Sequence, residues 1–526
     1  MRRQCRTQSV LRLFNHFALG AVCFFLGLAI IAVAAGDVYS APTPGIKRVI
    51  IAVPSEPDTL DLSNSKIGTA EAIGANITER LINITPDGKL VPGLAQSWKV
   101  STDGKDIDYF LRKGVVFHSG DPFTAKDVQF SHERAMKYFQ GYQRTMKFLE
   151  SFTVIDDYHV KFRFKTPDAQ VLPNRGTPIG SKTYHDRVGE ENYVRQPVGT
   201  GPYQFIKWEP GQFIEMKIFE NYWGSPPFVK EVRFIFIGED TTRVSKLMAG
   251  EVDMIVDCPF PKVNEVEKAG FVTARMPTHP TVSIQFHTYN PKVPWYDRRV
   301  RMAIAMAIDR KTIVNNLFQG IPNMYPRLCP WELGYDAGIT AYPYDPQKAK
   351  KLLAEAGYPK GFDMPLYYFM GRISGQKETT EAVALYLNNI GIRVKIEGLE
   401  AVRFIEKVRE WHKSTDTIFA GVATVPLSGY PEPTQALEIA YFSESAISLY
   451  KNLKFDEILN KARIVLDNKK RAVLIKDAVR LIHEDVATIP IWSNVTIFAT
   501  KKDISYKPTR NVANAIVFVK NIEKAR

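Results

Sequence analysis

The sequence has few cysteines and lacks the short motifs by which common enzyme classes are recognised. Only 4 of its 526 residues are cysteine, and no CxxC pair or Cys/His cluster is present. The phosphate loop GxxxxGK[ST], the metalloprotease motif HExxH, the nucleophile elbow GxSxG and the dinucleotide fingerprint GxGxxG are missing as well. We therefore expect no metal site, no cofactor and no enzyme activity built on these motifs.

Local acid/base pairs are also scarce. His118 with Asp121 and His132 with Glu133 are the nearest approach to one. Neither pair has a nucleophile or a third orienting group beside it, and such pairs arise by chance in a chain of this length. We expect both histidines to be structural, and an exported hydrolase or other enzyme with dispersed catalytic residues stays open as an alternative.

Charge of one sign is not concentrated beyond the first residues. The 69 Lys and Arg exceed the 56 Asp and Glu and give a net charge of +13. Basic and acidic residues nevertheless alternate, as they do between residues 451 and 480, and no basic run is interleaved with aromatics. This pattern favours a solvated surface over a nucleic-acid interface.

The long run without any charge, residues 17–35, lies near the N-terminus. Arginines precede it and Ala32-Val33-Ala34 provides an A-x-A-like cleavage site near its end. We expect a signal peptide over residues 1–35 and a periplasmic protein. A retained anchor remains open, because the run approaches the ~20 residues that span a membrane.

Cleavage of the leader would leave two cysteines, Cys258 and Cys329. An oxidising compartment can pair two thiols, but the sequence does not show whether these two lie close enough for a disulfide. We expect both to be free and buried.

The chain is too long for one core, because single cores stop growing near about 250–300 residues. Apolar periodicity and turn residues predict strands over residues 48–53, 98–100, 107–111, 154–164, 203–208, 213–219, 252–256, 365–369, 392–396 and 489–500. They predict helices over residues 124–137, 240–249, 298–318, 345–356, 377–389 and 468–484. The strand-helix-strand order indicates an α/β fold with a partly parallel sheet and two lobes between which the chain crosses more than once.

Four segments resemble, in family order, the bacterial extracellular solute-binding proteins of family 5, the dipeptide, oligopeptide and nickel group. They are residues 93–136, 197–254, 294–320 and 344–358, and they include the strings GTGPY, NYWG, AGEVD and YDPQKAKKLLAEAGY. The resemblance implies the large, type II periplasmic binding protein fold, α/β and two-lobed, with a subsidiary domain inserted in lobe I.

The same resemblance implies domain limits. Lobe I would comprise residues 46–80, 197–289 and 492–526, the subsidiary domain residues 81–196, and lobe II residues 290–491. The hinge would lie where the chain crosses between the lobes, near residues 287–291 and 491–495.

The implied function is that of the periplasmic substrate-binding component of an ABC importer. Such a protein captures a peptide or peptide-like solute between its lobes and delivers it to the membrane permease, which works with an ATPase. We expect a monomer that catalyses no reaction. A non-peptide solute, such as an oligosaccharide, an opine or a metal chelate, remains an alternative.

Two regions carry the ligand residues that the resemblance implies. The loop after the string TLDL would line the cleft with Ser65, Lys66, Gly68 and Thr69. From lobe II, Arg372 matches a region that supplies an arginine to the peptide carboxylate, a task that suits the two parallel hydrogen bonds of a guanidinium. The alternative for Arg372 is an exposed loop charge.

The third implied region departs from the family pattern. Peptide binders place an aspartate for the ligand α-amino group just before a YxxP-type turn, which here starts at Tyr430 and includes Glu432, but this chain has Gly429 in the place of the aspartate. A buried ammonium without a counter-charge costs several kcal/mol. We therefore expect the specificity of the cleft to have diverged from simple peptides unless Glu432 substitutes from a shifted position.

Overall fold

The structure is a computed structural model. It describes residues 45–525 except 66–67, 86–88, 173–175, 371–373, 413, 416–419, 426–432 and 510–516. Among these residues, no helix combines the length and the apolar character needed to cross a bilayer.

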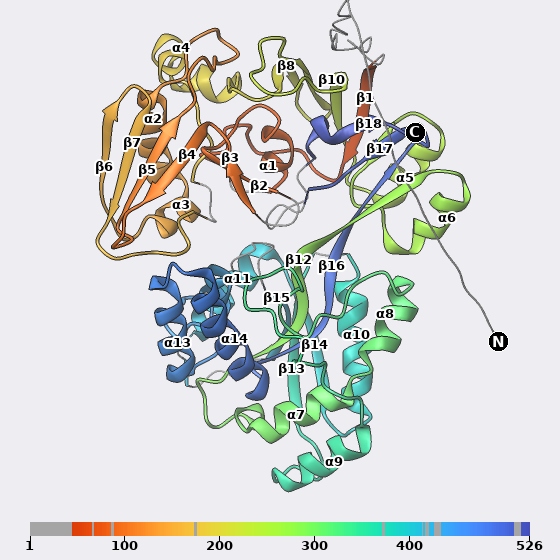
Figure 1. The fold of residues 1–526 in the computed structure, drawn as a ribbon. Coiled ribbons are helices and arrows are strands. Elements are labelled where there is room, and N and C mark those ends of the chain that lie inside the picture. Colours follow the sequence, from red (N-terminus) through yellow and green to blue (C-terminus); the bar gives the residue numbers. More distant parts are fainter. Residues whose placement is uncertain are drawn as a thin grey trace, which may run out of the picture. The chain divides into compact units, whose positions relative to one another are not determined.

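A ten-stranded sheet forms the centre of the fold (Figure 1). Its order is β14 (Arg393–Leu399), β13 (Asp363–Phe369), β15 (Ala420–Val425), β12 (Val272–Phe286), β16 (Thr488–Thr500), β11 (Met254–Ile255), β1 (Ile46–Val53), β10 (Val229–Phe236), β9 (Phe213–Ile218) and β8 (Tyr203–Glu209). Strand β1 runs parallel to β10 and β11, and β13 runs parallel to β14 and β15. The predicted α/β fold with a partly parallel sheet is confirmed.

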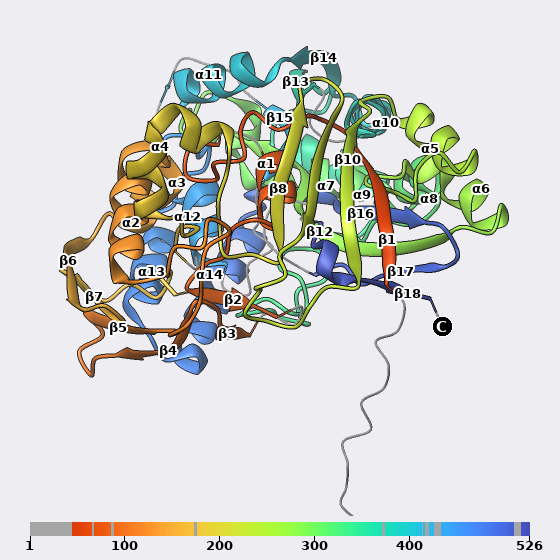
Figure 2. The same ribbon diagram turned by 90° about the horizontal axis from the view of Figure 1, so that it is seen from above.

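The predicted domain limits serve here as names for parts of the chain, and in these terms lobe I contains the β8 to β11 half of this sheet. In Figure 2 strands β8, β10 and β1 run alongside one another. Its other elements are α1 (Gly68–Gly74), α5 (Asp240–Met248), η1 (Phe260–Lys262), α6 (Val263–Lys268), β17 (Ile504–Tyr506), η3 (Val519–Asn521) and β18 (Ile522–Lys524). The β-branched run predicted as the first strand is β1, whose Val49 and Ile51 are fully buried beside Phe234 and Phe498.

The subsidiary domain has a separate apolar core and two small sheets. One sheet has the order β4 (Ala95–Val100), β5 (Asp106–Leu111), β7 (His159–Phe164), β6 (Leu149–Asp156), and the other joins β2 (Ile82–Ile84) to β3 (Leu90–Pro92). Its helices are α2 (Ala125–Tyr138), α3 (Gln140–Thr145) and α4 (Lys182–Arg195). Thr124 caps α2, as predicted, and its N–H donates to Asp127 Oδ2 at 2.8 Å.

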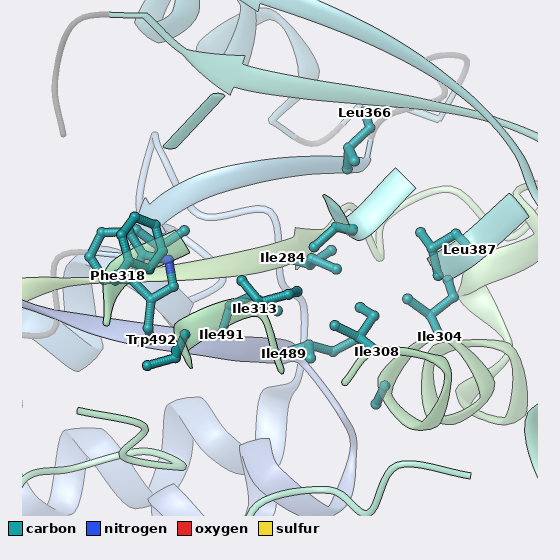
Figure 3. Close-up of a cluster of buried hydrophobic side chains, with 14 of the residues drawn as sticks. Ile284, Ile304, Ile308, Ile313, Phe318, Leu366, Leu387, Ile489, Ile491 and Trp492 are labelled. Carbon is teal, nitrogen blue, oxygen red and sulfur yellow. The ribbon is translucent and has the colours of Figure 1, made fainter. Parts of the chain in front are cut away.

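Lobe II is mostly helical around β13 to β15. It contains η2 (Pro294–Tyr296), α7 (Arg298–Ala307), α8 (Arg310–Phe318), α9 (Pro346–Glu355), α10 (Gln376–Asn388), α11 (Ala401–Trp411), α12 (Thr434–Tyr441), α13 (Leu453–Ile464) and α14 (Asn468–Glu484). The single helix predicted over residues 298–318 is wrong, because Asp309 leaves the helical conformation and caps α8 by accepting a hydrogen bond from Thr312 N. Figure 3 shows Ile304 of α7, Ile313 of α8 and Ile308, which lies between the two helices, in the buried cluster around β16.

Two long strands, β12 and β16, run from one lobe to the other (Figure 1). At one end β16 pairs with β11 of lobe I, and at the other end β12 pairs with β15 of lobe II. The ladder between β12 and β16 is interrupted between Pro277 and Thr281, where Pro277 and Pro280 have no N–H to donate. The break in β12 thus comes earlier in the chain than residues 287–291.

Cys258 and Cys329 are both buried, as predicted, and no disulfide joins them. Burial raises the pKa of the Cys258 thiol to about 12. The Cys258 thiol therefore lacks the exposure and the low pKa that reactive cysteines need.

Candidate functional site

The loop after β1 is held in place from within by its own side chains. Ser65 Oγ donates to Asp58 Oδ1 at 2.8 Å, and Ser63 N donates to Asp61 Oδ1 at 3.1 Å. Gly68 and Thr69 form the start of α1, and Lys66 lies outside the described residues. Of the predicted ligand residues in this region, Ser65 therefore belongs to the loop, and Gly68 and Thr69 belong to α1.

A buried arginine of the subsidiary domain anchors the same loop. Arg134 on α2 donates from Nη2 and Nε to Asp61 Oδ2 at 2.6 and 3.2 Å, and from Nη1 to Glu190 Oε2 of α4 at 2.6 Å. The side chains of Arg134 and Asp61 are 5% and 7% exposed. The hydrogen bond from Arg134 lowers the pKa of Glu190. Charge-assisted bonds in such a dry position fix geometry strongly.

A second buried network joins the subsidiary domain to lobe II. Arg463 of α13 donates from Nη2 and Nε to Asp168 Oδ2 at 2.7 and 3.1 Å, and from Nη1 to Glu438 Oε2 of α12 at 2.7 Å. Lys147 and Gln170 of the subsidiary domain also donate to Glu438, at 2.8 and 3.1 Å. We call these five residues the interlobe network.

The ion pair at the centre of the interlobe network is almost completely shielded from solvent. The Asp168 side chain is 0% exposed and that of Arg463 is 8% exposed, while the Arg463 guanidinium also lies 4.8 Å from the Phe148 ring centre. Burial raises the pKa of Asp168, and the Arg463 guanidinium opposes the rise. An ion pair of this kind holds only while both partners stay in place.

On the lobe II side, α10 begins just after the segment that contains Arg372. Arg372 itself lies outside the described residues. Gly375 is the N-cap in the left-handed conformation (φ 80°), and a Cβ there would meet the Phe318 ring at 2.2 Å. Trp492 Nε1 of β16 donates to Thr379 Oγ1 at 3.0 Å. The first turn of α10 is thus fixed against the crossing strand.

The remaining predicted site residues, Gly429, Tyr430 and Glu432, also lie outside the described residues. The chain resumes at Pro433, after which Thr434 starts α12. Helix α12 carries Glu438 of the interlobe network, and the segment with Gly429 comes shortly before this helix in the sequence.

His118 and His132 both form hydrogen bonds to groups other than the acids of the two predicted pairs. His118 shares a hydrogen bond of 2.8 Å with the Gly201 carbonyl, and burial lowers its pKa to about 4. His132 shares a hydrogen bond of 2.8 Å with Tyr142 Oη and stacks on Phe152. In the part of the chain that the structure describes, no three His, Cys, Asp or Glu side chains come together as a metal site.

A pocket of about 760 Å³ lies beside the loop after β1, but it does not contain the predicted ligand residues. It is lined by residues of lobe I and the subsidiary domain, among them Asp58, His118, Tyr184 and Trp208. Its described lining residues all lie between Asp58 and Pro210.

Sequence reasoning missed the residues that hold the two regions together. Arg134 stands in the first segment that carries the resemblance and Asp61 in the string TLDL, but in the sequence both look like ordinary surface charges. Asp168, Glu438 and Arg463 are separated by up to 295 positions in the sequence, so no local pattern links them. The signal that could have found them is pairwise covariation, which a single sequence does not contain.

The chain matches a known protein family over most of its length. The family model "Bacterial extracellular solute-binding proteins, family 5 Middle" matches residues 89–445. Heme-binding protein A of Haemophilus influenzae is 30% identical over 445 residues, which is 77% of this chain and 79% of that protein. The glutathione-binding protein GsiB of Pectobacterium atrosepticum is 26% identical over 89% of this chain and 92% of its own length.

Among solved structures, the periplasmic binding protein DppA of Helicobacter pylori in complex with the peptide STSA superposes with a TM-score of 0.74 at 25% identity. The alignment covers 92% of this chain and 99% of that structure. The two-lobed fold therefore extends over nearly all of the chain.

Proposed function

The chain belongs to the bacterial extracellular solute-binding proteins of family 5, and we propose that it captures a peptide-like solute carrying a carboxylate and delivers it to the membrane permease of an ABC importer. The interlobe network carries this proposal. In this network the buried Arg463 of α13 binds Asp168 of the subsidiary domain and Glu438 of α12. A charged contact between domains is the kind of contact that differs between a closed and an open arrangement.

Solute capture then follows from differential affinity. A solute that contacts both lobes binds the closed arrangement more tightly than the open one, so it shifts the population toward closure. We propose that the hinge lies at the interrupted ladder of β12, residues 277–281, and at the neighbouring residues 493–495 of β16. Closure would be the change that the permease detects.

The solute class rests on Arg372 and on the residue type at position 429. Arg372 would bind a carboxylate through parallel hydrogen bonds, and the N-terminus of α10, which begins three residues after Gly-Arg-Ile 371–373, adds a favourable dipole for the same anion. Gly429 supplies no acid for an α-amino group. We therefore propose a peptide-like acid whose recognition does not depend on a buried ammonium, with Ser65, Lys66, Gly68 and Thr69 contacting it from lobe I and Tyr430 and Glu432 from lobe II.

The names of the relatives support a small organic solute without fixing it. They describe binding of heme, of glutathione and of a peptide in complex. All three ligands carry carboxylates, which agrees with an arginine in the site. We propose that this chain works in the periplasm as a monomer after removal of residues 1–35.

Mass spectrometry of the protein purified under native conditions tests the function. We expect one co-purified solute with a carboxylate and a stoichiometry of one per chain, released unchanged on denaturation. A chemically altered product after incubation with that solute would contradict the proposal and favour the enzyme alternative.

Arg372→Ala is expected to raise the dissociation constant for the co-purified solute at least tenfold, because the carboxylate loses its charged partner. Lys66→Ala tests the opposing loop in the same titration of tryptophan fluorescence. Arg393→Ala is the matched control, since Arg393 of β14 is 61% exposed and pairs with the exposed Asp363. Unchanged binding in Arg372→Ala would remove this residue from the site.

A further inference from the structure

A pocket in lobe II contains a buried cation with spare hydrogen-bonding capacity. The pocket has a volume of about 280 Å³ and lies at the start of α8. Arg310, one of its lining residues, is 8% exposed. Its Nη2 donates to the Tyr342 carbonyl, and no other hydrogen bond of this guanidinium occurs within the described residues. A guanidinium has five N–H groups, so most of the donors of Arg310 are left for something else.

A second buried arginine adds to the positive charge. Arg327 is 3% exposed and donates to Tyr342 Oη at 2.7 Å, and the Cζ atoms of Arg310 and Arg327 lie 5.8 and 5.9 Å from the centre of the Tyr342 ring. Neither arginine forms an ion pair with a carboxylate anywhere in the described ranges. Two buried cations without a counter-charge are costly, which is why buried arginines are normally paired.

The other charged groups that line the pocket are Asp309 and Lys311. Asp309 lines the pocket, but its carboxylate accepts from Thr312 N and Oγ1 at 3.0 and 2.7 Å as the cap of α8. Lys311 lines the pocket too. The Asp309 charge raises the pKa of the Arg310 guanidinium and so opposes the effect of burial, but the two side chains form no ion pair within the described residues. Burial, with a further contribution from Arg327, lowers the pKa of Arg310 to about 10, so its guanidinium is still charged at neutral pH.

The rest of the wall is aromatic and apolar. It consists of Ile308, Met324, Tyr325, Pro326, Ala341, Tyr342, Tyr344 and Pro490. The volume corresponds to about nine water molecules at ~30 Å³ each, which leaves room for a ring or a short chain as well as a charged group. Aromatic walls with one convergent cation are typical of sites for small organic ligands.

We propose that this pocket is a second ligand site, which binds a small organic carboxylate with an apolar body by placing the carboxylate on Arg310 and the body against Tyr325 and Tyr344. The site lies wholly within lobe II and shares no residue with the predicted cleft. It therefore does not depend on the proposed function. Pro490 of the crossing strand β16 lines it, so an occupant would contact the strand that joins the lobes.

Thermal unfolding and calorimetric titration of the mature chain with benzoate test the proposal. We expect benzoate to raise the melting temperature in a saturable way and benzamide, its neutral isostere, to leave it unchanged. Inorganic phosphate at the same concentration is expected to bind at least tenfold more weakly, because it has no apolar body. Equal stabilisation by benzamide or by phosphate would overturn the proposal.

Two variants locate the binding. Arg310→Met is expected to weaken benzoate binding at least tenfold, and Ala341→Trp, which fills the pocket from an exposed lining position, is expected to abolish it without touching a buried charge. Lys350→Met on α9 is the matched control with an exposed cation. Benzoate binding that persists in a folded Ala341→Trp protein would overturn the proposal even if Arg310→Met failed to fold.

Discussion

Arg463→Met is expected to weaken binding of the co-purified solute at least a hundredfold. The substitution keeps the apolar stem of the side chain but leaves Asp168, whose side chain is 0% exposed, without its cation. Breaking a buried pair in this way costs about 3–5 kcal/mol, and each 1.4 kcal/mol corresponds to a tenfold change in an equilibrium constant. If the pair forms only on closure, the whole cost falls on the closed, solute-binding arrangement.

The same variant can be followed without any solute. Small-angle scattering is expected to give a larger radius of gyration for Arg463→Met than for the wild type. Lys461→Met is the matched control, because Lys461 and its partner Glu457 on the same helix are both more than half exposed and such pairs contribute at most about 1 kcal/mol. A loss of unfolding free energy with an unchanged dissociation constant would show that the pair is present in both arrangements and is not a closure contact.

Combining Arg463→Met with Asp168→Leu separates the ion pair from general packing. The double variant removes both charges, so no buried carboxylate is left unpaired, and replacement of a buried pair by apolar residues is often neutral. We expect affinity to recover most of what Arg463→Met loses. A double variant as weak as the single one would assign the effect to the contacts of Arg463 with Glu438 and Phe148 instead.

Local patterns in the sequence predicted most helices and strands because local chemistry determines them. Helix α14 spans residues 468–484 as predicted, since Asp467 caps its start and its apolar residues recur at helical spacing. The prediction of one helix over residues 298–318 was wrong, and the reason is again local chemistry. Asp309 satisfies the N–H of Thr312 and so starts a new helix, whereas the apolar periodicity runs on through both helices and hides the break.

The contacts that join domains could not be predicted in this way. Asp168 and Arg463 become partners only after the subsidiary domain and α13 have folded, and each is unremarkable in its local sequence. The break in the β12 ladder depends on which residues of β16 lie opposite Pro277, which is a property of the sheet register and not of either strand alone. For the ligand residues the family resemblance supplied positions, and their roles remain predictions.

Arg134→Met is expected to lower the free energy of unfolding by about 3–5 kcal/mol, measured by urea titration. The change leaves Asp61 buried without a cation and disconnects the loop after β1 from α2 and α4. That loop carries Ser65 and is followed in the sequence by Lys66 and Gly68, the proposed ligand residues. Solute affinity should therefore fall as well, because these residues would no longer be held in position. Arg195→Met is the matched control, because Arg195 and Glu191 of α4 form an exposed pair worth about 0.5 kcal/mol.

The pH dependence of this effect has a definite sign. The pKa of Glu190 is lowered in the folded protein by its bond to Arg134, so its share of the stabilisation is present above the ordinary glutamate pKa of about 4.3 and is lost as the pH falls through the lower folded value. The stability deficit of Arg134→Met relative to the wild type should therefore shrink below about pH 4. A deficit that stays constant from pH 7 to pH 3, or one under about 1 kcal/mol at pH 7, would show that packing of the Arg134 stem, and not its charge, anchors the loop.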